Sequence, residues 1–273
     1  MSVADLIAAL DLPTSCRVDQ RVPKKLLLEN GAPTSADRRK ITEGIEDIRW
    51  LAALKPSTIG VPEYRDQVRE YLEIAVITVT LRPEAQVGRI SELVHRAVPY
   101  PVFLVMAGLG NADLNLSLSH KRWAQNEAGK VVLEDEVVGV NVANSSMSPK
   151  VQQSFLAALS LAHQPRQHLL ALYQGWLDAL LAVQAAVITG TFTRTSTVED
   201  SLARRAALQQ VQQLAAQIAA LRKSAVKEKQ MARQVELNLE LKRLQQEMEL
   251  NVRTITISDN LSDKNGDYSK IKV

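Results

Sequence analysis

The stretch "YLEIAVITVTL" (Tyr71–Leu81) is dense in β-branched residues and lies between Pro62 and Pro83. Such side chains pack well on a pleated surface, so the stretch predicts a buried strand. In "GRISELVHRAV" (Gly88–Val98) apolar residues recur at three- and four-residue spacing, which indicates an amphipathic helix. The run "YPVFLVM" (Tyr100–Met106) predicts a second buried strand. This order of strand, helix and strand places a sheet at the centre of the fold.

Two further segments extend the sheet. The stretch "ADLNLSLSHKRW" (Ala112–Trp123) alternates leucine with asparagine or serine, as expected for a strand with one buried face. A turn at Gly129 follows, and "VVLEDEVVGVNV" (Val131–Val142) predicts its partner strand. We therefore expect residues 1–145 to form an α+β domain around a small mixed or antiparallel sheet with helices.

Two helices are predicted before the sheet. Residues 3–10, "VADLIAAL", indicate a short amphipathic helix. The segment "TSADRRKITEGIEDIRWLAALKP" (Thr34–Pro56) begins with a capping residue, and Ile41, Ile45 and Ile48 recur at helical spacing. We expect this helix to continue as far as Pro56, which ends it.

The second half of the chain is predicted to be helical. Residues 146–195 are expected to form a helical hairpin from two apolar helical stretches, "PKVQQSFLAALSLAH" and the segment Arg166–Ile188. Residues 196–252 contain no Gly or Pro and indicate one very long coiled-coil helix. Residues 253–273 are polar and are expected to form a disordered tail.

The long helix carries two apolar registers. Leu214, Ile218 and Leu221 follow the spacing of a coiled-coil seam, and a second register begins near Leu237. An apolar band this wide predicts contact with two neighbours, or with a helix on one side and a domain on the other. The predicted interaction residues are Leu214, Ile218, Leu221, Val235, Leu237, Leu239, Leu241, Leu244 and Met248.

The distribution of charge is compatible either with binding of nucleic acid or with an ordinary charged surface. The formal net charge is only +3, so the distribution of charge matters more than its total. Basic clusters occur near the N-terminus and along the long helix, where they either contact phosphates or form an ordinary solvated surface. The candidate contacts are Lys24, Lys25, Arg38, Arg39, Lys40, Arg222, Lys223, Lys227, Lys229 and Arg233.

The sequence contains no recognisable catalytic motif. There is no phosphate-binding loop, dinucleotide fingerprint or nucleophile elbow, and the single cysteine, Cys16, has no histidine near it. A metal-dependent nuclease core could draw acids from Asp66 and Glu73, but no lysine stands two residues after Glu73. We therefore expect no catalytic residue, no metal and no cofactor.

One segment resembles a membrane span by length. Leu169–Gly190 is apolar, but Gln174, Asp178 and Gln184 interrupt it, and an aspartate is costly inside a bilayer. A buried helix of a cytoplasmic protein without membrane contact is the better interpretation.

Several segments together resemble a known family. They include "VPKKLLLEN", "IEDIRWLAALKPSTIGV", "LNLSLSHKRW", "VPYPV" (Val98–Val102), "LYQGW" (Leu172–Trp176) and "EKQMARQVELNLELKRLQQEMEL". In this order they resemble the bacterial domain of unknown function 4391 (DUF4391). The resemblance implies an accessory protein encoded beside DNA methyltransferases and helicase-type restriction or phage-defence components. It implies no catalytic residue.

Two functional hypotheses follow. The first is a non-catalytic assembly subunit of a bacterial DNA-processing or anti-phage complex, which binds copies of itself, helicase components or methyltransferase components through coiled-coil contacts. The alternative is a nucleic-acid-binding protein or a metal-dependent nuclease subunit that contacts DNA through the basic clusters.

Overall fold

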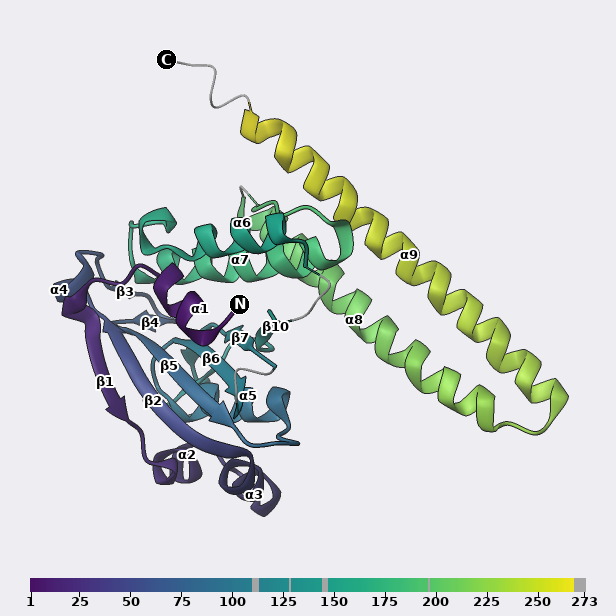
Figure 1. Cartoon of the computed structure of the whole chain (residues 1–273), viewed down its shortest axis with the longest axis horizontal. Helices are drawn as coiled ribbons and strands as arrows, with labels where there is room; N and C mark the ends of the chain where they lie inside the picture. Colours follow the sequence, from purple (N-terminus) through teal and green to yellow (C-terminus); the bar gives the residue numbers. More distant parts are fainter. Residues whose placement is uncertain (110–112, 128, 144–146, 196, 268–273) are drawn as a thin grey trace. The chain divides into compact units, whose positions relative to one another are not determined.

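The computed structural model describes residues 1–109, 113–127, 129–143, 147–195 and 197–267, with side chains up to residue 256 (Figure 1). The chain divides into two compact units, Met1–Leu180 and Leu181–Val273. The boundary falls inside helix α7 (Leu169–Thr189), whereas the sequence placed domain limits at residues 145 and 195.

A mixed six-stranded sheet is the centre of the first unit. In the described residues its strand order is β1-β2-β5-β6-β7-β10. The β5–β6 pair is parallel, and the other neighbouring pairs are antiparallel. The strands are β1 (Arg17–Arg21), β2 (Ile45–Leu54), β5 (Ile74–Leu81), β6 (Val102–Gly108), β7 (Asn115–Leu118) and β10 (Val138–Asn141). The predicted α+β class with a mixed sheet is confirmed.

Helix α5 (Val87–Ala97) makes the crossover between the two parallel strands, as a parallel pair requires. It packs with α2 (Lys24–Asn30) and α3 (Ser35–Gly44) on one face of the sheet. The alternate residues of β5 reach this layer, because successive side chains of a strand point to opposite faces. They are Ala75, Ile77, Val79 and Leu81.

The beginning of α7 packs against the same unit. Its Trp176 meets Phe103 of β6 edge-on, with ring centroids 5.0 Å apart, and the indole Nε1 donates to Leu159 O at 2.8 Å. Leu159 is the last residue of α6 (Pro149–Leu159), so one side chain joins α7 to both the sheet and α6. Helix α1 (Val3–Ala9) begins with a capping box between Ser2 and Asp5.

The helix predicted over Thr34–Pro56 is wrong in its second half. The helix α3 ends at Gly44, and β2 starts at the next residue, between β1 and β5. Register shifts interrupt the β2–β5 pairing at Ile45/Asp47 and at Trp50/Ala52. Each irregularity disturbs the two-residue alternation, so the buried positions of β2 imitate helical spacing.

Two predicted strands are each divided in the structure. The segment Ala112–Trp123 forms β7 and β8 (Lys121–Trp123), and Val131–Val142 forms β9 (Val131–Leu133) and β10. Ala112 and the predicted domain limit at Ser145–Ser146 lie outside the described residues. The remaining elements are η1 (Thr14–Cys16), α4 (Pro56–Ile59), β3 (Tyr64–Arg65), β4 (Glu70–Tyr71) and η3 (Leu161–His163).

The second unit contains a helical hairpin, where the sequence predicted one long helix. Helix α8 (Val198–Lys227) and helix α9 (Met231–Asp267) run antiparallel beside each other (Figure 1). Glu228 is extended, and its carboxylate accepts the amides of Lys229 and Gln230 at 2.8 and 2.9 Å. This side chain replaces the helical bonds that those amides lose, so the chain reverses without glycine or proline.

Helix α9 continues to Asp267, although the sequence predicted a disordered tail from residue 253. Residues 268–273 of that predicted tail lie outside the described residues.

Candidate functional site

A buried polar network joins α7 to the strands, and the tyrosine and glutamine of the "LYQGW" segment take part in it. Tyr173 donates to Val102 O at 2.8 Å and accepts the Ser119 amide at 2.9 Å. Gln174 Oε1 lies 2.7 Å from His120 Nε2, and the Tyr71 hydroxyl lies 2.5 Å from His120 Nδ1. Since an amide oxygen only accepts, His120 donates from Nε2 and accepts from Tyr71 at Nδ1. Burial raises the pKa of Tyr71, so its hydroxyl remains protonated.

A second buried network surrounds the C-terminal end of α5. Ser117 of β7 lies 2.8 Å from the Ser91 hydroxyl and 3.1 Å from His95 Nε2. Lys121 Nζ donates to His95 O at 2.6 Å and also to Val98 O. These carbonyls belong to the last turn and cap of α5, where the helix dipole also favours a cation. Lys121 therefore caps a helix from a neighbouring strand.

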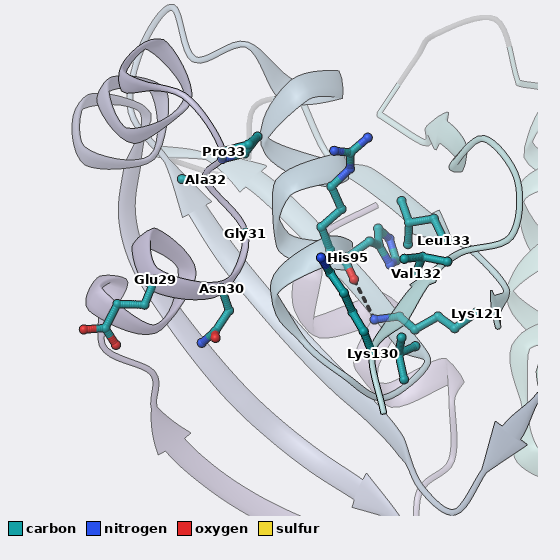
Figure 2. Close-up of a pocket in the computed structure, with 12 residues that line it drawn as sticks. Glu29, Asn30, Gly31, Ala32, Pro33, His95, Lys121, Lys130, Val132 and Leu133 are labelled. Carbon is teal, nitrogen blue, oxygen red and sulfur yellow. Dashed lines mark hydrogen bonds between the residues drawn. The ribbon is translucent and has the colours of Figure 1, made fainter. Parts of the chain in front are cut away.

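A cavity of about 430 Å³ opens beside this network, and we name it the α5–β9 cavity. Figure 2 shows His95 and Lys121 on one side, with the segment after α2 on the other. Position 31 of that segment requires glycine, because a Cβ there would stand only 2.5 Å from Leu93 O. The lining comprises Glu29, Asn30, Gly31, Ala32, Pro33, His95, Arg96, Lys121, Lys130, Val131, Val132 and Leu133.

Burial changes the protonation of both basic groups at this cavity. It lowers the pKa of His95 to about 3, with a further contribution from the Lys121 charge, so the imidazole is neutral. Burial lowers the pKa of Lys121 to about 7. Among the described residues, His95 Nδ1 is buried without a hydrogen-bond partner. The cavity thus combines a titratable amine with a neutral imidazole.

The residues considered for a nuclease core have separate roles. Asp66 accepts the amides of Val68 and Arg69 at 2.7 and 2.5 Å, in the turn between β3 and β4. Glu73 is 6% exposed and pairs with Lys55 at 3.1 Å, so a lysine does reach it, but from the end of β2. In the part of the chain that the structure describes, no group of three His, Cys, Asp or Glu side chains could hold a metal.

The N-terminal basic cluster is partly engaged in the fold. Lys24 Nζ donates to Thr42 O at 3.4 Å and to Ile45 O, at the C-terminal end of α3. Lys25 and Arg39 form ion pairs with acids one turn further along their helices, at 3.7 and 2.8 Å. Arg38 is exposed and Lys40 is half-buried. The cluster therefore offers less free charge than its sequence suggested.

The basic positions of the second unit lie near the hairpin turn. Arg233 approaches Glu228 at 3.7 Å. The other four are exposed, and within the described residues they have no ion pair or side-chain hydrogen bond. They are Arg222, Lys223, Lys227 and Lys229.

The nine predicted interaction residues occupy different environments. Six form the inner face of the hairpin: Leu214, Ile218 and Leu244 are buried, and Leu221, Leu241 and Met248 pack against them. Leu237 is half-buried outside this cluster. Val235 and Leu239 are 57% and 64% exposed. Most of the second apolar register thus belongs to the part of α9 that packs back against the first register on α8.

An exposed apolar stripe follows the other side of α9, and we name it the outer stripe. Met231, Val235 and Leu239 recur every four residues, and Leu250 lies eleven residues later, close to three helical turns. All four are at least 57% exposed. They lie about half a turn around the helix from Leu241 and Leu244, so the stripe is opposite the inner face.

Sequence patterns missed the α5–β9 cavity because its residues come from four separate segments. The alternation in "LNLSLSHK" did hold a signal, since its polar side carries serines followed by a lysine. Ser117 and Lys121 are 2% and 3% exposed, so this side of the segment is also buried, where the sequence predicted one buried face. The hydroxyls of the serines can form hydrogen bonds with a covering helix and are compatible with burial, whereas a lysine is typical of a solvent-exposed position, so the burial of Lys121 could not be predicted from the pattern.

Helix α7 is long and apolar enough to cross a membrane, judged by length and composition within the described residues. However, 67% of the most apolar 18-residue stretch of this helix is buried inside the protein. The bonds of Tyr173, Gln174 and Trp176 fit a core helix better than a lipid-facing one.

The fold and these sites define a class of mixed α+β proteins in which a helical hairpin follows a sheet unit. Residues 10–248 match the family described as domain of unknown function DUF4391, and the chain belongs to this family. No curated protein and no solved structure showed significant similarity to the chain.

Proposed function

We propose that this protein is a non-catalytic assembly subunit that binds protein partners through the outer stripe of α9. The supporting observation is the exposure of four aliphatic side chains on the side of α9 opposite its packed face. Met231, Val235 and Leu239 are neighbours on successive turns, and exposed apolar surface of this kind often marks an interaction site. A setting in a bacterial DNA-processing or anti-phage complex, with helicase or methyltransferase components, rests on the family resemblance alone.

The partner that best fits the outer stripe is a second copy of this chain. Leucine, valine and methionine at helical spacing bind an equivalent stripe by side-chain packing. Residues of both charge signs accompany the stripe, with Glu236 beside it and Lys242 within it, so two copies can approach without like-charge repulsion along the whole contact.

The test is the mass of the full chain in solution by light scattering after size exclusion. We expect the wild type to exceed the 30.1 kDa of one chain as concentration rises. The double variant Val235→Asp, Leu239→Asp should remain at one chain, because a charged carboxylate is costly in an apolar contact.

The matched control is Gln234→Glu with Asn238→Asp, which adds the same charge at exposed positions beside the stripe. This control should assemble like the wild type. A wild type that stays monomeric at every concentration, or a stripe variant that assembles equally well, would contradict the proposal.

A second candidate function is binding of nucleic acid at the hairpin turn. The observation in its favour is the group of four exposed cations without partners, Arg222, Lys223, Lys227 and Lys229. The affinity for a DNA duplex, measured by fluorescence anisotropy, should fall steeply with salt. Replacing all four by Gln should flatten that slope, whereas the paired positions Lys25 and Arg39 serve as controls. Binding that salt does not change would reject this candidate.

A further inference from the structure

We propose that the α5–β9 cavity binds a small organic oxyanion, a carboxylate or phosphate group on an apolar body, with Lys121 as its principal contact. This site is separate from the outer stripe and does not depend on the assembly function.

The first argument is the hydrogen-bonding capacity of Lys121. Its side chain is 3% exposed, and its amino group donates to His95 O and Val98 O. A charged ammonium has three N–H donors, so among the described residues one donor has no acceptor. Lys121 also lines the cavity, where a ligand oxygen could supply that acceptor.

The second argument is the charge around the cavity. Arg96 and Lys130 line it together with Lys121, and Glu29 is the one acidic side chain of its lining. Arg96 and Lys130 are exposed and pair with Glu92 and Glu127 at 2.5 and 2.7 Å. These carboxylates balance the two rim cations, so among the described residues of the lining Lys121 is the cation that no ion pair offsets, and it is the group that favours an anion.

The third argument is the apolar part of the walls. Ala32 and Pro33 line one side, and Val131–Leu133 of β9 contribute aliphatic surface. The volume of about 430 Å³ lies in the lower part of the range for small-molecule sites. A ligand with an aliphatic body fills this space better than a bare inorganic ion.

Protonation gives the site a pH dependence with a defined sign. The pKa of Lys121 is about 7 in the free protein, and a bound oxyanion favours the charged form. Affinity should therefore decrease as the pH rises above 7. His95 is already neutral in this range, and Glu29, Arg96 and Lys130 are the other ionisable side chains that line the cavity.

The experiment titrates the isotopically labelled full chain with acetate, butyrate and inorganic phosphate at constant ionic strength, followed by amide chemical shifts. We expect saturable shifts at Lys121, His95 and Val132. Butyrate should bind about 15-fold more tightly than acetate, since it has two more methylenes and each buried methylene contributes about fourfold. Tighter binding of phosphate than of acetate would assign a phosphate group, and the reverse order a carboxylate.

Variants separate the site from surface charge. Lys121→Met should weaken binding by at least about tenfold, and Lys130→Gln by two- to threefold, whereas Lys150→Met on α6 should leave it unchanged. If Lys121→Met does not fold, Val132→Phe takes its place, because a phenyl group occupies the cavity. Shifts that are linear in concentration and spread over surface cations, or unchanged affinity in a folded Lys121→Met or Val132→Phe variant, would overturn the proposal.

Discussion

The two units differ in how many large apolar side chains they expose: among the described residues the first unit exposes Leu26, Val68 and Leu109, and the second exposes eight. Residues 1–180 bury polar groups such as Lys121 and His120 and supply hydrogen-bond partners for them inside the fold. The α8–α9 hairpin leaves Met231, Val235 and Leu239 in solvent, where aliphatic side chains gain nothing. The first arrangement stabilises a self-contained domain, and the second is typical of a surface that binds a partner.

The largest effect is expected from Trp176→Ala in the first unit. The substitution removes a fully buried indole, its contact with Phe103 and its bond to Leu159 O. We expect a loss of about 4 kcal/mol in the free energy of unfolding, measured by urea denaturation. A loss below about 1 kcal/mol would contradict the view that this unit is self-contained.

Leu244→Ala tests the inner face of the hairpin. Leu244 is 5% exposed and packs with Leu214 and Ile218 in a small cluster. We expect a local loss of about 2 kcal/mol, because a narrow helix pair can relax around the missing atoms. Faster amide exchange in α8 and α9, with unchanged exchange in β5 and β6, would distinguish this loss from global unfolding.

His95 gives a pH prediction for the first unit. Its pKa falls from 6.5 in the unfolded chain to about 3 in the fold, so the unfolded chain binds more protons between these values. The contribution of His95 to stability is therefore complete above pH 6.5 and is lost as the pH falls toward 3, with a slope of at most about 1.4 kcal/mol per pH unit. In urea denaturation at several pH values, His95→Gln should show a shallower loss than the wild type. Equal slopes would contradict the prediction.

The smallest effect is expected at the outer stripe. In a monomer, Val235→Asp with Leu239→Asp should change the unfolding free energy by less than about 0.5 kcal/mol per site, because both side chains are exposed. Thermal unfolding at low concentration measures this. A large destabilisation would show that the stripe supports the hairpin itself.

The sequence predicted elements whose apolar pattern is uninterrupted. The core of β5 and the helix α5 appear within a few residues of their expected bounds, because β5 is a continuous run rich in β-branched residues and α5 keeps its helical spacing throughout. The strand β2 was missed because its register shifts break the alternation. The hairpin turn was missed because Glu228 uses a side-chain acceptor where glycine or proline would have been visible.

The candidate sites were predictable to different degrees. Local spacing identified apolar residues along α8 and α9. Which of them lie on the inner or the outer side depends on the position of the turn, which the sequence did not predict. The contact between Lys121 and His95 joins residues 26 positions apart, and nothing in local spacing indicates such a contact. Lys24 shows the same limit, since a lysine in a basic cluster caps α3 through tertiary packing.

The reversal at Glu228 also permits exchange between chains. With this carboxylate removed by Glu228→Ala, residues 198–267 could continue as one helix of about 100 Å. Two such chains could then form between them the same inner face that one chain forms alone, which is domain swapping. In such an exchanged dimer Leu214 of one chain would pack against Leu244 of the other, where in the single chain they pack together.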